Sequence, residues 1–226
     1  MDVVVTACRA CPRLVAWREE VAATRRAAFR DQTYWGRPVP GFGPEDARVL
    51  VVGLAPAAHG ANRTGRMFTG DRSGDVLFAA LHRTGWASQP LSTSAGDGMR
   101  LTGLRMTAPV HCAPPANMPT PQERTTCGAW LRRELELLGP RLRVLLVLGG
   151  FGWQALLSEL PALGWSVPVP RPAFRHGGEA TVVDPLGRPV TVLGCYHVSQ
   201  QNTFTGRLTP DMLDAVLSRA RELAGS

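Results

Sequence analysis

The chain has 226 residues, of which 44% are hydrophobic and 19% charged, a composition typical of one folded domain and unlike a disordered segment. Its formal net charge is +7, and all 25 basic residues are arginines. The lack of lysine excludes Schiff-base catalysis, attachment of pyridoxal phosphate and a Walker-type phosphate loop. A basic surface favours a polyanionic partner such as nucleic acid, although the codon bias of a GC-rich genome explains the same arginine excess.

The N-terminal sequence does not resemble a secretory signal, because an acid stands at position 2 and few apolar residues follow it. No apolar run approaches the roughly 18 residues that a membrane span needs. We therefore expect a cytoplasmic protein without a membrane-spanning segment.

The first half of the chain predicts helices on both sides of a buried strand. The apolar run of residues 48–53 has the length and composition of such a strand. A glycine-rich loop, residues 55–70, follows it, and a glycine at position 85 is suited to end the next helix. The helices are predicted over residues 12–30 and from residue 73 or 74 to 85, and residues 86–100 are predicted to be a mobile connection.

The second half continues the alternation of strands and helices. A second strand is expected within residues 101–112, and a third over residues 143–149. Thr120, Pro121 and Glu123 form a capping box with proline at the first helical position, which predicts a helix start there. The remaining predicted elements are a helix to about residue 138, a helix over 152–160, paired strands at 181–183 and 189–194, and a last helix capped at Thr209 and ending at 224.

This order predicts a three-layer α/β/α sandwich with a central, mostly parallel, four-stranded sheet, in a single domain over residues 1–226. Sheets of this kind bind ligands at the carboxyl ends of their strands. The loops that follow Gly53, Cys112, Gly149 and His197 are therefore the places where a site is expected.

Five cysteines are present, and four of them suggest a metal centre. Disulfides are rare in a reducing compartment, so clustered cysteines point to metal binding or catalysis. Cys8 and Cys11 form a C-x2-C motif, while Cys112 and Cys127 lie far downstream beside turn and cap residues. Four thiolates can hold an iron–sulfur cluster or a tetrahedral zinc ion, and the wide second pair favours the bulkier cluster. Four unrelated buried cysteines are the alternative, and Cys195 is interpreted as a core thiol.

Three loops carry polar or flexible residues at the expected edge of the sheet. The loop after the first strand combines several glycines with Phe68 and Asp71, although Asp71 could equally be an ordinary helix cap. The loop after the second strand contains Asn117, which can read one edge of a base or serve as a turn residue. The segment from Cys195 to Arg207 contains His197, which can donate to a developing oxyanion or play a structural part.

Together these features resemble the uracil-DNA glycosylase superfamily, and most of all its iron–sulfur type, called family 5 or type B. The resemblance is carried by the four cysteines, the loop GLAPAAHGANRTGRMFTGD and the segment YHVSQQNTFTGRLT. It extends from Cys8 to the final helix. Each motif is weak alone, but the three in this order with this cysteine spacing are specific.

The resemblance implies a role for each motif. Cys8, Cys11, Cys112 and Cys127 would hold a [4Fe–4S] cluster that clips the N-terminal segment onto the domain, with zinc as the alternative. Asp71 and His197 would be catalytic. The base would be bound by Gly53, Ala55, Phe68 and Asn117, with Phe68 stacking on it. DNA contacts are expected from Arg63, Arg66, Asn202 and Arg207.

Two departures from the superfamily pattern are visible. Family-1 enzymes carry a polar, water-activating residue just after the first strand, where this chain has Ala57 and Ala58. The superfamily's His-Pro-Ser motif here reads His-Val-Ser. Both departures are consistent with the broader base tolerance attributed to this type, which includes hypoxanthine and mismatched pyrimidines.

The implied activity is that of a monofunctional, monomeric DNA glycosylase in base excision repair. It would flip a deaminated base out of double- or single-stranded DNA and hydrolyse its N-glycosidic bond. Without a lysine it should leave an uncut abasic site. The alternative is an iron–sulfur redox or DNA-sensing protein without glycosylase activity.

Overall fold

A five-stranded sheet forms the middle of the molecule in the computed structural model, which describes residues 2–225. The strand order is β2-β1-β3-β5-β4, and the pairs β1–β2, β1–β3 and β3–β5 are parallel. The strands are β1 (Val49–Val52), β2 (Leu104–Thr107), β3 (Val144–Leu148), β4 (Glu179–Val183) and β5 (Pro189–Cys195). The predicted α/β class with a mostly parallel sheet is therefore confirmed.

The predicted strand number, four, was one too low. The fifth strand is β4, which pairs antiparallel with β5 at the edge of the sheet through the predicted turn around Asp184. Asp184 fixes this turn by accepting hydrogen bonds from the backbone N–H groups of Leu186 and Arg188. The short connection makes β4 and β5 a hairpin, so β4 extends the sheet beyond its parallel strands.

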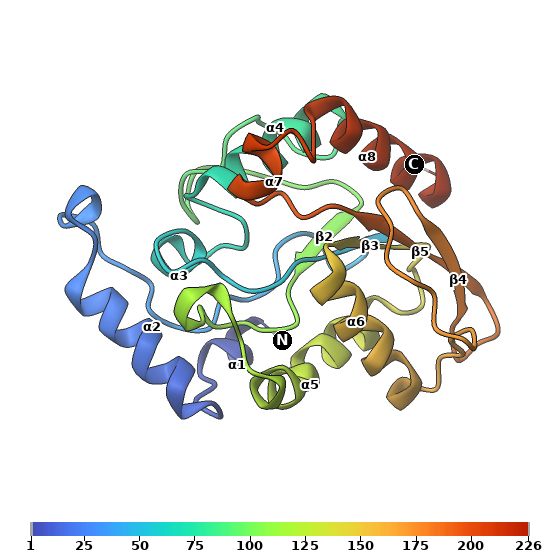
Figure 1. Ribbon diagram of the computed structural model, residues 1–226, viewed down its shortest axis with the longest axis horizontal. Coiled ribbons are helices and arrows are strands. Elements are labelled where there is room, and N and C mark those ends of the chain that lie inside the picture. Colours follow the sequence, from blue (N-terminus) through green and yellow to red (C-terminus); the bar gives the residue numbers. More distant parts are fainter. Residues whose placement is uncertain (1, 226) are drawn as a thin grey trace.

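Helices cover both faces of the sheet, as Figure 1 shows. They are α1 (Asp2–Thr6), α2 (Pro12–Thr24), α3 (Ala61–Thr64), α4 (Arg72–Arg83), α5 (Pro121–Leu138), α6 (Gly150–Glu159), α7 (Gln200–Phe204) and α8 (Pro210–Ala224), with short 3-10 turns at Ala27–Phe29, Pro115–Asn117 and Leu160–Leu163. Alternate residues of β1 explain the layering. Val49 and Val51 pack with α4 and α8, whereas Leu50 and Val52 pack with α5 and α6.

Helix boundaries follow local chemistry. Thr120 and Glu123 form the predicted capping box at the start of α5. The helix predicted over residues 12–30 ends earlier, at Thr24, because Arg25 adopts φ +56° and closes it with a hydrogen bond to the carbonyl of Val21. Within residues 2–225, no helix combines the length and the apolarity that crossing a lipid bilayer requires.

Candidate active site at the carboxyl edge of the sheet

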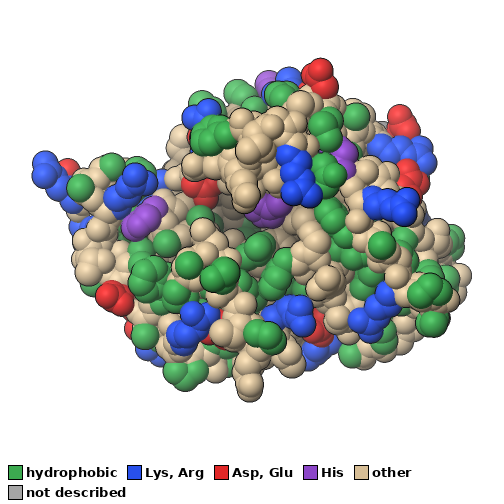
Figure 2. All heavy atoms as spheres, viewed as in Figure 1, with side chains coloured by type: hydrophobic (Ala, Val, Ile, Leu, Met, Phe, Trp, Pro, Cys, Tyr) green, Lys and Arg blue, Asp and Glu red, His purple; other side chains and the backbone are tan. Residues whose placement is uncertain are grey.

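A pocket lies at the carboxyl end of β1, between the glycine-rich loop and the segment after β5. Figure 2 shows a hollow across this side of the molecule with histidine and acidic side chains in it and basic side chains on both sides. The pocket brings together four of the predicted site residues. Its lining consists of Leu54, Ala55, Pro56, Ala57, Ala61, Met67, Phe68, Asp71, Ala108 and His197.

Asp71 both caps α4 and faces the pocket. Its Oδ1 accepts a hydrogen bond of 2.9 Å from the backbone N–H of Gly74, which is the ordinary role of an N-cap aspartate. Its Oδ2 lies so close to Gly60 that a Cβ atom there would overlap it. The cap fixes one oxygen, and the missing side chain at position 60 leaves room for the other.

Phe68 stands opposite the end of β1 in an unusual backbone conformation. Its φ is +54°, which a bulky residue adopts only when its surroundings impose it. The ring packs against Gly53, where an added Cβ would lie 2.5 Å from the ring atom Cζ. Gly53 is therefore required to be a glycine by the position of the ring, which supports its predicted place in the site.

His197 reaches the pocket from the end of β5. Gly149, with φ +91°, lets the histidine approach the end of β3, because a Cβ there would lie 3.2 Å from the Cβ of His197. The side chain of Asn202 donates a hydrogen bond of 2.8 Å to the carbonyl of His197. Burial lowers the pKa of His197, while the charge of Asp71 opposes that shift. The imidazole is therefore neutral at neutral pH and able to donate one N–H.

Asn117 does not line the pocket. It is exposed, in the 3-10 turn Pro115–Asn117, and both Ala116 and Asn117 have positive φ angles. Its backbone N–H donates to the carbonyl of Pro114 at 3.2 Å. In this conformation Asn117 holds a turn beside the site.

Two of the three arginines predicted to contact DNA are used inside the protein. The Arg63 guanidinium donates to the carbonyls of His59 and Gly70 and to Gln32. Arg66 is only 5% exposed, and it donates to Asp97, Ser92 and the carbonyl of Ala95. Arg66 therefore fastens the loop of residues 92–97 and does not reach a DNA phosphate from the surface.

Arg207 is placed differently, and Arg72 and Arg124 share its arrangement; Arg37, which lies 5.7 Å from the ring centre of Trp35, also does so but comes before β1 in the chain. Arg207 is exposed with its guanidinium 4.7 Å from the ring centre of Tyr196. Arg72 stacks on Phe204 at 4.9 Å and Arg124 on Phe151 at 5.9 Å. Within residues 2–225 none of the three side chains forms a hydrogen bond or an ion pair. We name Arg72, Arg124 and Arg207 the rim arginines: Arg72 is the first residue of α4, Arg124 lies in the first turn of α5 and Arg207 follows α7, so each comes after the carboxyl end of a strand, at the edge of the sheet where the pocket lies. No sequence motif marked Arg72 or Arg124.

The four predicted metal-binding cysteines line one cavity. Cys8, Cys11, Cys112 and Cys127 surround it together with Leu14, Arg18, His111 and Trp130. Burial raises the pKa of the Cys112 thiol to about 11 and that of the Cys127 thiol further. Four cysteine sulfurs facing one cavity are a donor set that a metal centre can use, because thiolates that bind a metal are stabilised by its positive charge.

The geometry of the cysteines does not resemble a single-ion site. Within residues 2–225, no three His, Cys, Asp or Glu side chains converge closely enough to hold one metal ion. The four cysteines nevertheless line one common cavity. The cavity lies near the pocket, since Ala55 lines the pocket and packs against the apolar cluster that contains Leu14, Val110, Cys112 and Cys127.

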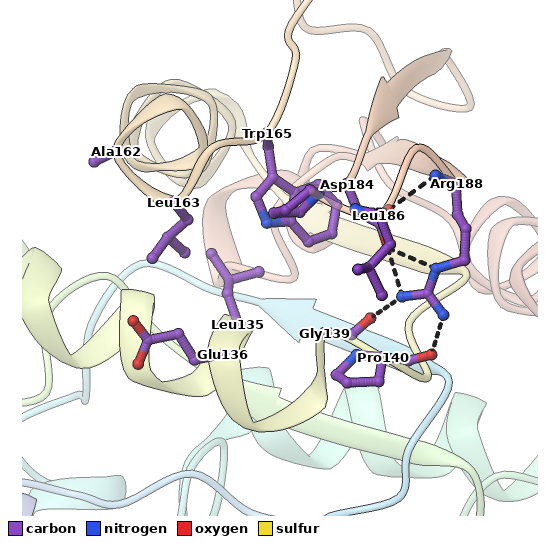
Figure 3. Close-up of a pocket in the computed structure, with 11 residues that line it drawn as sticks. Leu135, Glu136, Gly139, Pro140, Ala162, Leu163, Trp165, Asp184, Leu186 and Arg188 are labelled. Carbon is purple, nitrogen blue, oxygen red and sulfur yellow. Dashed lines mark hydrogen bonds and ion pairs between the residues drawn. The ribbon is translucent and has the colours of Figure 1, made fainter.

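A larger cavity of about 450 Å³ lies at the opposite end of β5. Figure 3 shows its walls, which come from the end of α5, the turn after α6 and the β4–β5 hairpin. Two of its charged groups are used within the fold, because Arg188 donates to Asp184 and to the carbonyls of Gly139 and Pro140. Asp184 and Arg188 therefore hold the hairpin against α5, and the third, Glu136, pairs with Arg133.

Comparison with known proteins agrees with the geometry. The model of the family described as "Uracil DNA glycosylase superfamily" matches residues 40–221. A type-5 uracil-DNA glycosylase of Mycobacterium bovis is 58% identical over 225 residues, covering 100% of this chain and 81% of the relative. One of Thermus thermophilus is 52% identical, with 98% and 95% covered. A type-4 uracil-DNA glycosylase of Archaeoglobus fulgidus is 30% identical over 160 residues, with 70% and 69% covered. The chain belongs to the uracil-DNA glycosylase superfamily.

Proposed function

We propose that this protein excises uracil from DNA as a monofunctional glycosylase in base excision repair. The observation that carries the proposal is the meeting of an aromatic ring, a carboxylate and a neutral imidazole in one pocket, on Phe68, Asp71 and His197. The relatives named type-5 uracil-DNA glycosylases, 48–58% identical over nearly the whole chain, support the same activity.

The base side of the reaction is assigned to Phe68 and His197. A base reaches the pocket only after its nucleotide is flipped out of the duplex, at a cost of a few kcal/mol. The Phe68 ring would then stack on the base. Negative charge develops on the base as the glycosidic bond breaks, and the N–H of neutral His197 stabilises it.

The sugar side is assigned to Asp71. It is the single carboxylate among the ten described residues that line the pocket, and the small side chains of Ala55 and Ala57 offer no hydrogen bond to water. A carboxylate can stabilise the positive charge that develops on the sugar, or orient the attacking water. The absence of lysine leaves no side-chain amine for Schiff-base cleavage of the strand, and none of the described residues that line the pocket carries an amine, so the expected product is an intact strand with an abasic site.

We further propose that hypoxanthine and mismatched pyrimidines are substrates. Alanines at positions 55, 57, 61 and 108 form much of the pocket wall and cannot test the edge of a base by hydrogen bonding. Asn117 can do so only if the turn at residues 115–117 closes over the pocket. Selection then depends on how easily a mispaired base is flipped out, which favours a broad range of substrates.

The rim arginines are the proposed phosphate contacts. Each is free of carboxylate partners and is supported by an aromatic ring, so its charge is available to DNA. They replace Arg63 and Arg66 in that role, while Arg207 keeps it. Asn202 is assigned to positioning His197 through its carbonyl.

We also propose that the four cysteines hold a [4Fe–4S] cluster. The shared cavity and the absence of single-ion geometry among the described residues support the cluster over zinc. When bound, the cluster supplies a structural link between Cys8 and Cys11 of the N-terminal segment and Cys112 and Cys127 of the domain. The reaction is carried by other residues of the chain.

The experiment uses labelled DNA duplexes that contain uracil, hypoxanthine or thymine opposite guanine, with and without alkali after incubation. We expect strand cleavage from the uracil duplex only after alkali, and slower cleavage from the other two. Cleavage without alkali would refute the monofunctional mechanism. No cleavage of any duplex by iron-loaded protein that binds DNA would refute the glycosylase and leave a redox or DNA-sensing protein.

A further inference from the structure

Arg18 is a buried cation beside the cysteines. It lies on α2 and is only 2% exposed. Its Nη1 donates a hydrogen bond of 2.9 Å to Sγ of Cys112, and its Nη2 donates one of 3.2 Å to the carbonyl of Cys8. Arg18 therefore contacts both halves of the cysteine set, although it is 94 residues from Cys112 in the sequence.

The charge of Arg18 is not balanced by a nearby buried acid. Within residues 2–225 its one ion-pair partner is Glu19, at 3.8 Å, which is 44% exposed and is also bound by Arg9. The Nε of Arg18 has no hydrogen-bond partner. A buried guanidinium needs a close counter-charge, because the cost of removing its water is several kcal/mol.

Protonated thiols cannot supply that counter-charge, but thiolates bound to iron can. A cluster held by four cysteine thiolates carries net negative charge, and hydrogen bonds and charges near its sulfurs tune its potential. The guanidinium lines the same cavity as all four cysteines. The cavity is therefore arranged for an anionic group larger than a thiol.

We infer that Arg18 is a positioning residue for the iron–sulfur cluster: its guanidinium holds the Cys112 sulfur, balances the charge of the cluster and protects it against oxidation. The inference rests on the proposed cluster but not on glycosylase activity. Arg18 makes no contact with the pocket, so its removal is expected to change the properties of the cluster and leave the chemistry of base excision unchanged.

The test compares iron-loaded wild-type protein with the Arg18→Gln, Arg18→Lys and Arg9→Gln variants. Arg9→Gln is the matched control, because Arg9 lies between Cys8 and Cys11 in the sequence but its side chain is 62% exposed. For each protein we would measure iron content, the midpoint potential, the rate at which the visible cluster absorption bleaches in air, and the single-turnover rate of uracil excision.

We expect Arg18→Gln to have a lower midpoint potential than the wild type and to bleach about tenfold faster, since loss of a positive charge disfavours the more reduced, more negative cluster. Arg18→Lys keeps the charge but loses the forked donor, so it should fall between the two. Arg9→Gln should match the wild type. Excision per iron-loaded molecule should stay within twofold in all four proteins.

If Arg18→Gln has the midpoint potential and the bleaching rate of the wild type, the inference is overturned. An arginine with only a structural role would lower the folding stability and leave these two quantities unchanged. If Arg18→Gln does not fold, Arg18→Lys decides the matter in the same way. Wild-type protein without iron would overturn the cluster and this inference together. Wild-type protein with iron but without excision would refute the proposed activity alone.

Discussion

Gly60 acts on the reaction through Asp71. A methyl group at this position would overlap the free carboxylate oxygen, and the backbone there, with φ −99° and ψ −106°, lies outside the regions that L-residues favour. We predict that Gly60→Ala slows uracil excision at least tenfold, which corresponds to about 1.4 kcal/mol of activation free energy, and also lowers the melting temperature, so the excision rate is measured where the variant is folded. Single-turnover assays and thermal melting measure the two effects.

The matched control for Gly60→Ala is Gly96→Ala. Gly96 has no atom within 4 Å of an added Cβ, and its φ is outside the positive range. Excision by the control should equal that of the wild type. Equal rates for Gly60→Ala and Gly96→Ala would show that the position of the Asp71 carboxylate does not limit the reaction.

The protonation state of His197 predicts how the single-turnover rate of uracil excision depends on pH. Burial lowers its pKa and the Asp71 charge only partly offsets this, so the neutral form persists as pH falls through the ordinary histidine pKa of about 6.5. The single-turnover rate should therefore stay level from pH 8 to about 6. A tenfold change per pH unit starting near pH 7 would mean that His197 titrates normally and that the mechanism needs its charged form.

Residue patterns predicted some of the site, and long-range contacts determined the rest. Asp71, Phe68 and His197 follow recognisable strands and motifs, so the sequence was enough to place them together. The burial of Arg66 depends on Asp97, which is 31 residues away, and could not be read from local pattern. Arg18 belongs to no sequence motif, and only the fold brings it next to Cys112, 94 residues away.

Among the elements, long apolar strands and capped helices were predictable and very short helices were not. The runs that form β1 and β3 are fully buried, and Thr120 and Thr209 cap their helices as their motifs indicate. The short helices α1, α3 and α7 have four or five residues each, too few to show a helical period. Tertiary contacts, such as the hydrogen bond from Asn62 to the carbonyl of Arg18, hold α3 in place.

Arg66 and Arg207 have different roles: Arg66 is buried and stabilises the fold, whereas Arg207 is exposed and is proposed to contact DNA. Burial alone would raise the pKa of Asp97, but hydrogen bonds from Met99, Arg66 and Thr93 hold it at about 2, so Arg66 pairs with a full negative charge. We predict that Arg66→Ala destabilises the protein by about 3 kcal/mol, because it leaves that carboxylate unpaired. Chemical unfolding measures this loss, and the salt dependence of DNA binding should not change.

Arg207→Ala should have the opposite pattern of effects: an unchanged stability and a changed salt dependence of DNA binding. Arg207 is exposed and rests on Tyr196, so its loss should change stability little. We expect the slope of log binding constant against log salt concentration to fall in magnitude by about 0.9, the contribution of one phosphate contact. A changed slope in Arg66→Ala with an unchanged slope in Arg207→Ala would contradict the assignment of the rim arginines.

At the scale of the whole molecule, the cysteine cavity joins the N-terminal segment to the domain. We predict that Cys8→Ala loses iron and melts well below the wild type, because it breaks the link between α2 and the loop that carries Cys112. The control is Cys195→Ala, since Cys195 is buried at the end of β5 and does not line the cavity. Equal iron content and melting temperature in Cys8→Ala and wild type would contradict the structural role of the cluster.

Ala55 lines the pocket and packs against the cluster that contains Cys112 and Cys127, and the hydrogen bonds of Asn62 connect α2 to the loop that forms the pocket. We propose that the chain carries two separate centres, one that stabilises and one that reacts. This separation is the central claim, and Asp71 tests it most directly.

The decisive measurement is single-turnover excision of uracil by Asp71→Asn, together with its affinity for uracil-containing DNA. The substitution keeps an oxygen to cap α4 and removes the negative charge from the pocket. We predict that the variant retains its iron, binds DNA within about twofold of the wild type and excises uracil at least a hundredfold more slowly. An excision rate equal to that of the wild type would show that the Asp71 carboxylate is a helix cap alone and that the reaction is carried by another group.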